Sequence, residues 1–407
     1  MRVHVLGGGA AQLNIIKRIK ELGHTVIVSD YLADAPGKDF AHYSSMVSTF
    51  DIEGIEEISK WYDADGILTL GTDQPVLTAA TCANRLSLPS VLTDEQALIV
   101  THKKIMKRRF TEQGIPTVPW VCIPRDFDPL DLKGIRAPFV MKPLDSQGQR
   151  GIFKVDTIEE IRNYFDTTLS FSRDSQILIE QYYPHDELTV SGWVHEGILK
   201  VLTITDRITQ DTPPSIGVCF AHRYPTKFIE DEVEITTLSE QIVTAIELKE
   251  GPIYIQLLKG SDGYLVNEIA ARIGGAFEEY IIPAVTGVPV NDLLIDSALG
   301  EYRDPLIHYE RRALSAYVLF FFARPGKVSS IGNLDDILSI EEVITADYLI
   351  CEGTQVRKTE NATQRAGYVV LCTTPDKIDK ILDRVVRQFS IQDQNGCDMI
   401  VPFKEFQ

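Results

Sequence analysis

Basic residues are scarce in this sequence relative to acidic ones. The 407 residues include 40 lysines and arginines against 58 aspartates and glutamates, which gives a formal net charge of −18. Such a chain is disfavoured as a general nucleic-acid-binding or anionic-membrane-binding protein. Because salt screens long-range repulsion beyond roughly 8 Å, a polyanion would need only a local cluster of lysine, arginine and metal.

Cysteines are few, and long apolar runs are lacking. The six cysteines form no CxxC pair, so we predict no zinc or disulfide framework and favour reduced thiols in a cytoplasmic protein. The longest apolar run, residues 313–323, is interrupted by Ser315 and Tyr317 and is too short to cross a bilayer. The first residues lead directly into a strand and a glycine turn, unlike a signal peptide. We therefore expect a cytoplasmic location.

The chain is long enough for two to four packed units. Its first hundred residues alternate strand and helix, which predicts a parallel sheet with right-handed crossovers. The middle reads as antiparallel hairpins with helices, one of which we expect to begin at a capping box at Thr237. From about residue 311 the chain restarts with a long strand. We predict a mixed α/β and α+β fold in three domains, at 1–100, 101–310 and 311–407.

A glycine-rich turn, Gly7-Gly8-Gly9-Ala10-Ala11-Gln12, follows the first predicted strand, and Asp30 ends the second. A dinucleotide-binding fingerprint would carry its last glycine where Gln12 stands. We therefore favour a tight turn that brings the helix close to the strand. An NAD-dependent oxidoreductase remains an alternative.

Lys142 ends an apolar strand and precedes the polar turn at 145–151. A lysine at such a place can meet a phosphate, while the backbone N–H groups of the turn hold the remaining oxygens. A surface lysine beside a mobile hairpin fits the same pattern equally well.

Farther along, Glu180 ends a buried strand and Glu187 follows it. Such hydrogen-bond acceptors suit an adenine amino group or a ribose hydroxyl. Exposed carboxylates are common, however, so an ordinary surface position explains them as well.

Gln256 and Glu268 lie on the two strands of one predicted hairpin. Two oxygen donors on paired strands can hold Mg²⁺, which takes few protein ligands. Arg272 follows four residues after Glu268 and could stabilise charge on a transferring phosphoryl group or an acyl phosphate. The structural alternative is an ion pair between Glu268 and Arg272.

The order and spacing of these features resemble the ATP-grasp superfamily. The stretch 264–275, YLVNEIAARIGG, is similar to its metal-binding signature. Segments 324–326 and 365–370 look like the small closing domain of the branch that holds L-amino-acid ligases, biotin carboxylases and carbamoyl-phosphate synthetases. The resemblance implies a Rossmann-like pre-ATP-grasp domain at 1–100, an ATP-grasp domain at 101–310 with a lid at about 138–205, and a closing domain at 311–407.

The resemblance also implies roles for individual residues. ATP would be bound by Lys103, Lys142, Ser146, Gly148, Gly151, Glu180, Gln181, Tyr183 and Glu187. Gln256 and Glu268 would hold Mg²⁺, or alternatively Mn²⁺, and Arg272 and Lys142 would act in catalysis. The substrate pocket would include Arg207, His222, Arg223 and Gly275, although surface charge explains the first three equally well. Two departures from the family are Gln256, where many members carry Glu, and Ala270, where Asn is usual.

The implied activity is an ATP-dependent ligase. It would activate a carboxylate, such as an amino acid or a similar small acid, as an acyl phosphate and transfer it to an amine, releasing ADP and phosphate. A bicarbonate-activating enzyme of the carboxylase or carbamoyl-phosphate type is one alternative. A non-catalytic nucleotide-binding protein is another, because of Gln256 and Ala270. The expected partners are small molecules, not nucleic acid or membrane. The oligomeric state is open, with a homodimer as one option.

Overall fold

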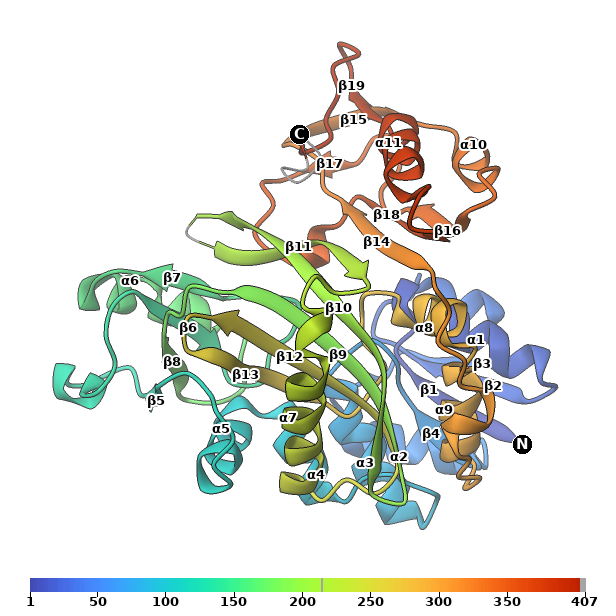
Figure 1. Ribbon diagram of the computed structural model, residues 1–407. Coiled ribbons are helices and arrows are strands. Elements are labelled where there is room, and N and C mark those ends of the chain that lie inside the picture. Colours follow the sequence, from blue (N-terminus) through green and yellow to red (C-terminus); the bar gives the residue numbers. More distant parts are fainter. Residues whose placement is uncertain (214, 403–407) are drawn as a thin grey trace.

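The structure of the protein, a computed structural model, describes residues 1–213 and 215–402 (Figure 1). The first part of the chain forms a four-stranded sheet in the order β3-β2-β1-β4, and every neighbouring pair is parallel. The parallel sheet expected from the alternating pattern is thus confirmed. Its strands are β1 (Arg2–Leu6), β2 (Thr25–Ser29), β3 (Tyr43–Ser45) and β4 (Gly66–Leu68), and its helices are α1 (Ala10–Glu21), α2 (Ile52–Trp61) and α3 (Gln74–Leu86).

The glycine turn before α1 is closed by side chains of the protein itself. Gly7 has a φ of +100°, a conformation that glycine adopts without steric penalty. The Gly9 N–H donates to Gln12 Oε1 at 3.1 Å, and the Gly8 N–H donates to the Asp30 carboxylate at 2.9 Å. Gln12 and Asp30 therefore hold the turn together, which supports the tight-turn interpretation over a dinucleotide site.

Two short helices, α4 (Asp94–Thr101) and α5 (Lys103–Glu112), connect the first sheet to a second, mainly antiparallel sheet of twelve strands. The main path of this sheet runs β13-β12-β9-β10-β11-β7-β6-β8-β5, and β14 continues from β11 to β18 and β16. The strands are β5 (Trp120–Ile123), β6 (Phe139–Pro143), β7 (Phe153–Val155), β8 (Ile177–Gln181), β9 (Asp186–His195), β10 (Ile198–Thr212), β11 (Ser215–Tyr224), β12 (Gly251–Gly260), β13 (Gly263–Ala270), β14 (Ser315–Phe321), β16 (Val343–Tyr348) and β18 (Gly367–Thr373).

The remaining elements cover these sheets or form a small third one. They are α6 (Ile158–Leu169), α7 (Glu232–Ala245), α8 (Glu278–Thr286), α9 (Val290–Ala298), α10 (Leu334–Leu338), α11 (Ile378–Gln388), and the strands β15 (Gly326–Ile331), β17 (Gln355–Val356) and β19 (Ile391–Asp393). The helix start predicted at Thr237 is wrong. α7 begins five residues earlier, at Glu232, and the Thr237 hydroxyl donates to the Val233 carbonyl within the helix, at 2.8 Å.

Contacts cross both of the predicted domain boundaries. β14 pairs with β11, so the C-terminal part shares a sheet with the middle of the chain. α9 lies against the first sheet (Figure 1), where Arg18 of α1 forms an ion pair with Asp292 at 2.7 Å. The first sheet and α9 thus share one apolar core. The division into 1–100, 101–310 and 311–407, with a lid at about 138–205, remains our proposal.

Within the described residues, no single helix is long and apolar enough to cross a membrane. α8 and α9, bent by 114° at the break between them, meet the length and composition criteria as a pair.

Candidate active site

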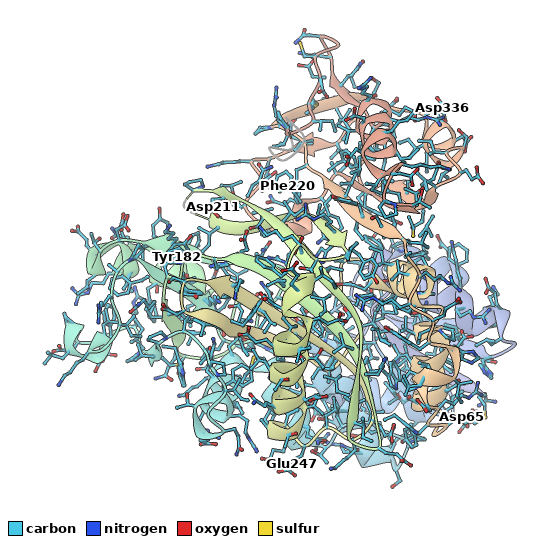
Figure 2. All side chains as sticks on the ribbon, in the orientation of Figure 1. Asp65, Tyr182, Asp211, Phe220, Glu247 and Asp336 are labelled. Atoms are coloured by element: carbon cyan, nitrogen blue, oxygen red, sulfur yellow. The ribbon has the colours of Figure 1, made fainter. Side chains whose placement is uncertain are left out.

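A cavity of about 320 Å³ is lined by segments from all three predicted parts of the chain. An adjoining hollow shares Tyr182, Glu187 and Gly217 with it and extends to Asp211 on β10 (Tyr182 and Asp211 are labelled in Figure 2). Gly151 and Arg223 are not part of the cavity lining, whereas the other predicted site residues are. The lining includes Lys103, Lys142, Ser146, Gly148, Glu180, Gln181, Tyr183, Glu187, Arg207, His222, Gln256, Glu268, Arg272 and Gly275.

Two lysines converge on one end of the cavity. Lys142 reaches it from β6, and its Nζ donates to Asn267 Oδ1 at 2.8 Å. Lys103 reaches it from the start of α5; its Nζ donates to the Ser146 carbonyl at 2.8 Å and lies 3.6 Å from Glu268 Oε2. A strand end and a helix start thus place two ammonium groups beside the polar turn, an arrangement that suits phosphate binding.

The polar turn folds over the cavity. Gly148, Gln149 and Gly151 have φ values of +67°, +62° and +70°. The Ser146 hydroxyl and Gln149 Oε1 are buried and have no hydrogen-bond partner within residues 1–213 and 215–402. Because buried polar groups are normally satisfied, the Ser146 hydroxyl is free to donate to a ligand oxygen such as that of a phosphate, whereas the Gln149 amide oxygen would need a donor.

The tip of this turn touches three separate parts of the chain. The Asp73 N–H donates to Gln147 Oε1, and Gln149 Nε2 donates to the Gly217 carbonyl. The Ala362 N–H donates to the Gly148 carbonyl at 3.2 Å. The turn therefore closes the cavity against the first sheet, β11 and the C-terminal part together.

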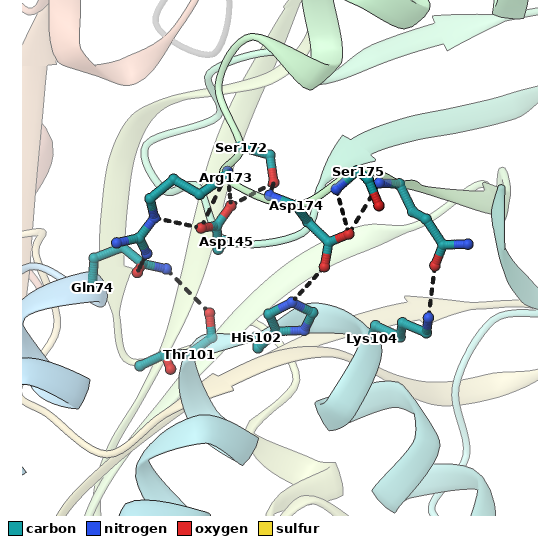
Figure 3. Close-up of polar contacts among 10 residues, drawn as sticks. Gln74, Thr101, His102, Lys104, Asp145, Ser172, Arg173, Asp174 and Ser175 are labelled. Carbon is teal, nitrogen blue, oxygen red and sulfur yellow. Dashed lines mark hydrogen bonds and ion pairs between the residues drawn. The ribbon is translucent and has the colours of Figure 1, made fainter. Parts of the chain in front are cut away.

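The base of the turn is fixed by a polar network (Figure 3). Asp145 accepts hydrogen bonds from the Ser172 hydroxyl at 2.5 Å and Arg173 Nε at 2.8 Å. Although burial opposes it, these bonds lower the pKa of the Asp145 carboxyl. Arg173 also donates to Gln74 Oε1 at 2.7 Å, and His102, the residue before Lys103, contacts Asp174 at 3.2 Å. The network ties the turn to α3 and α5.

Glu180 is bound by two lysines. Its side chain is buried, with Lys107 Nζ and Lys142 Nζ each 2.6 Å from a carboxylate oxygen. Burial raises the pKa of Glu180, but the two ammonium groups outweigh burial and lower it to about 2. Because both oxygens hold lysines, we infer that the predicted adenine contact falls to the backbone at 181–183 rather than to this carboxylate.

Glu187, the predicted ribose acceptor, belongs to a second buried network. Its carboxylate pairs with Arg207 and accepts from Gln256 Nε2 at 2.7 Å. Burial raises the pKa of Glu187, but Arg207 and the nearby His185 outweigh burial and lower it to about 2. Glu187 thus neutralises Arg207, one of the residues proposed for a substrate carboxylate.

The predicted metal ligands face each other across a strand pair. Gln256 lies opposite Glu268 in the β12–β13 register. Burial raises the pKa of Glu268, but nearby cations, first among them Lys103, lower it overall, so this carboxyl is ionised. No three His, Cys, Asp or Glu side chains within the described residues gather as a metal site. An ionised carboxylate and an amide oxygen nevertheless fit the oxygen preference of Mg²⁺.

Arg272 pairs with Asp73, not with Glu268 as the structural alternative supposed. Arg272 Nη2 lies 2.6 Å from Asp73 Oδ1, and the guanidinium sits 4.7 Å from the centre of the Tyr254 ring. Gly275 follows close by, where a Cβ would lie 2.3 Å from the Gly71 carbonyl oxygen. Glycine is thus required where the backbone after Arg272 meets the loop after β4.

The remaining predicted substrate residues differ in position. His222 lies buried in β11, and burial lowers the pKa of its imidazole well below the usual value, so it is neutral near pH 7. Arg223, on the same strand, pairs with Asp206 at 2.6 Å. Tyr254, Asn267 and Arg365 also line the cavity, although no site role was predicted for them. Asn267 directly precedes Glu268 within the stretch 264–275 that resembles the metal-binding signature, which was a local signal for it. Tyr254 and Arg365 had no such signal, because only the fold brings them to the cavity.

Two family models match this chain. An ATP-grasp domain matches residues 135–279, and L-amino acid ligase C-terminal domain 2 matches residues 318–393. Among curated relatives, an L-arginine-specific L-amino acid ligase from Bacillus subtilis is 20% identical over 306 residues, which is 72% of each chain. A formate-dependent phosphoribosylglycinamide formyltransferase from Mycobacteroides abscessus is 25% identical over 205 residues, 46% of this chain and 49% of that enzyme.

A solved structure extends this likeness to the whole fold. The crystal structure of an L-amino acid ligase from Bacillus licheniformis superposes with a TM-score of 0.82 and 18% identity, covering 97% of this chain and 99% of that one. The ATP-grasp model spans β6 to β13 with the polar turn, and the second model spans most of the C-terminal part. Residues 135–279 therefore form an ATP-grasp domain, and residues 318–393 form a domain of the L-amino acid ligase C-terminal type.

Proposed function

We propose that this protein is an ATP-dependent ligase that activates a small carboxylate as an acyl phosphate and transfers it to an amine. The observation that carries the proposal is the convergence of Lys103, Lys142 and Arg272 with the ionised Glu268 in one cavity. The likeness to amino acid ligases supports the carboxylate and amine as reactants.

In this proposal ATP lies along the cavity between β8 and α5. The backbone at 181–183 and the apolar side chains of Val140 and Leu258 hold the base. Lys103, Lys142 and the Ser146 hydroxyl hold the phosphates. Glu268 and the Gln256 side-chain oxygen would hold Mg²⁺, or Mn²⁺ in its place, which when bound neutralises phosphate charge.

The chemical step is then an in-line attack of the carboxylate on the γ-phosphoryl group, which forms an acyl phosphate and releases ADP. The lysines and Arg272 neutralise the charge spread over the transferred group. The amine next attacks the acyl carbon and displaces phosphate. The turn at 145–151, closed against Asp73, Gly217 and Ala362, excludes water that would hydrolyse the acyl phosphate.

The test is ADP release with Mg²⁺ against a panel of amino acids, dipeptides and small acids, followed by mass spectrometry of the products. Lys142→Ala should lower turnover by roughly 10²-fold or more, because it removes a cation from the transferring group. Lys133→Ala, at an exposed lysine, is the matched control and should retain activity. Normal turnover by a folded Lys142→Ala protein would refute the assignment.

The alternatives give different results in the same assay. ATP turnover that depends on bicarbonate would favour the carboxylase or carbamoyl-phosphate type. ATP binding without ADP release under any mixture would favour the non-catalytic protein, and a fluorescence change with NADH would favour the oxidoreductase. We further propose a cytoplasmic location, in keeping with six free thiols, and a homodimer as the assembly to test by light scattering.

A further inference from the structure

Arg365 differs from the other lysine and arginine side chains that line the cavity. Each of the others has an acidic partner, as the contacts above show. Arg365 forms no ion pair within residues 1–213 and 215–402. The paired cations are Lys103 with Glu268, Lys142 with Glu180, Arg207 with Glu187 and Arg272 with Asp73.

The guanidinium of Arg365 is held in place without being neutralised. It lies 3.5 Å from the centre of the Phe320 ring, and its Nη1 donates a long hydrogen bond of 3.4 Å to the Gly275 carbonyl. Its Nε is shielded from solvent and has no partner within the described residues. Burial lowers the pKa of Arg365 to about 10, so the group still carries its charge at neutral pH.

The surroundings of Arg365 compensate this charge poorly. Glu278 is the nearby acid, but burial raises the pKa of its carboxyl, which favours its neutral form. Arg207, although it is paired with Glu187, also lowers the pKa of Arg365, and burial raises the pKa of the Cys219 thiol. A poorly solvated guanidinium without a counter-charge is unfavourable. Its planar fork of donors matches the two oxygens of a carboxylate or phosphate.

The position of Arg365 indicates which reactant would bring that anion. Arg272 Nη1 donates to the Ile273 carbonyl at 3.2 Å, and Arg365 approaches the same backbone two residues later, at Gly275. Arg272 faces the reacting carboxylate and the lysines face ATP under the proposed function. A second oxyanion beside Gly275 therefore belongs to the other reactant, the amine.

The segment that carries Arg365 also touches the closing turn. The Ala362 N–H donates to the Gly148 carbonyl, and a Cβ on Gly148 would lie 3.0 Å from the Thr363 methyl group. The region around Arg365 is thus enclosed when the turn covers the cavity. We propose that Arg365 binds an oxyanion, a carboxylate or a phosphate, of the amine substrate. This deepens the proposed function and rests on it.

The experiment measures ADP release by the full chain at saturating ATP with the acid that supports the fastest turnover. The amines are the twenty amino acids, their amides and the matching aminoalkylphosphonates. We expect wild type to use anionic amines and to discriminate against the amides. Arg365→Met should raise the KM of the best anionic amine roughly 10- to 100-fold, leave the KM of ATP unchanged and remove the discrimination. Arg365→Lys should keep part of the discrimination against the amides.

Arg324→Met, at an exposed arginine of the same C-terminal part, is the matched control and should behave as wild type. Preference for the amino acid or for the phosphonate tells which oxyanion is bound. Equal use of amides by wild type, or an equal loss of all amines in a folded Arg365→Met protein, would overturn the role of Arg365 while leaving the ligase assignment intact. If wild type released no ADP with any mixture, the proposed function would fail, and the amine assignment with it.

Discussion

Glu180→Gln tests whether the buried charge network beside the proposed phosphate site has the balance that the distances indicate. Glu180 is 2% exposed and lies 2.6 Å from both Lys107 and Lys142. Glutamine in its place leaves two buried lysines without the carboxylate that they share. Because removal of one partner from a buried pair leaves uncompensated charge, we expect a loss of about 3–5 kcal/mol in the free energy of unfolding at neutral pH.

The pH dependence gives a second estimate of the same interaction. The pKa of Glu180 is lowered from 4.5 to about 2 in the folded protein. A difference of this size corresponds to about 3 kcal/mol of stability at neutral pH. Since the folded pKa is the lower one, the contribution is complete above pH 4.5 and is lost as the pH falls towards 2. Wild type and Glu180→Gln should therefore converge in stability over this range.

Lys107→Met provides the internal comparison. It leaves Glu180 paired with Lys142, so the remaining buried charges still balance. It also removes an ammonium group that burial disfavours, as the lowered pKa of Lys107 indicates. We therefore expect Lys107→Met to be less destabilising than Glu180→Gln.

The assay is urea unfolding followed by circular dichroism, at neutral pH and at about pH 3, where part of the wild-type contribution is lost. Glu57→Gln, at an exposed position of α2, is the control and should change stability little. If Glu180→Gln unfolds at the same urea concentration as wild type, or is more stable than Lys107→Met, the charge balance inferred from these distances is wrong.

Two further predictions concern the cavity. Gly275→Ala should lower kcat at least roughly 10-fold with little change in circular dichroism, because a Cβ would lie 2.3 Å from the Gly71 carbonyl and displace the backbone after Arg272; unchanged kinetics would contradict this close approach. Gln256→Glu should destabilise the protein without metal by about 1–3 kcal/mol, since it replaces the donor to Glu187 with a like charge. The same variant should need less Mg²⁺ for half-maximal ADP release, and a higher requirement in a metal titration would argue against Gln256 as a ligand.

Local pattern was sufficient for much of the fold and for part of the site. Alternating strands and helices predicted the parallel first sheet, because each element's apolar period is encoded in its own residues. Lys142 at the end of a buried strand and the glycine-containing turn after it could be recognised, since a strand end and a left-handed turn are local features. The start of α7 was misjudged because a capping box at Thr237 fits the interior of a helix whose true start has no side-chain cap.

Only the tertiary structure decided which charges neutralise one another. Arg272 pairs with Asp73, 199 positions away in the chain, and Lys142 meets a carboxylate that Lys107 shares from another element. Sequence spacing cannot encode these partners, because ion pairing depends on distances of a few ångströms between side chains that separate elements carry. The acidic, cysteine-poor composition disfavoured whole classes of protein. For the reason just given, it could not show that Arg365 reaches the cavity without an ion-pair partner among residues 1–213 and 215–402.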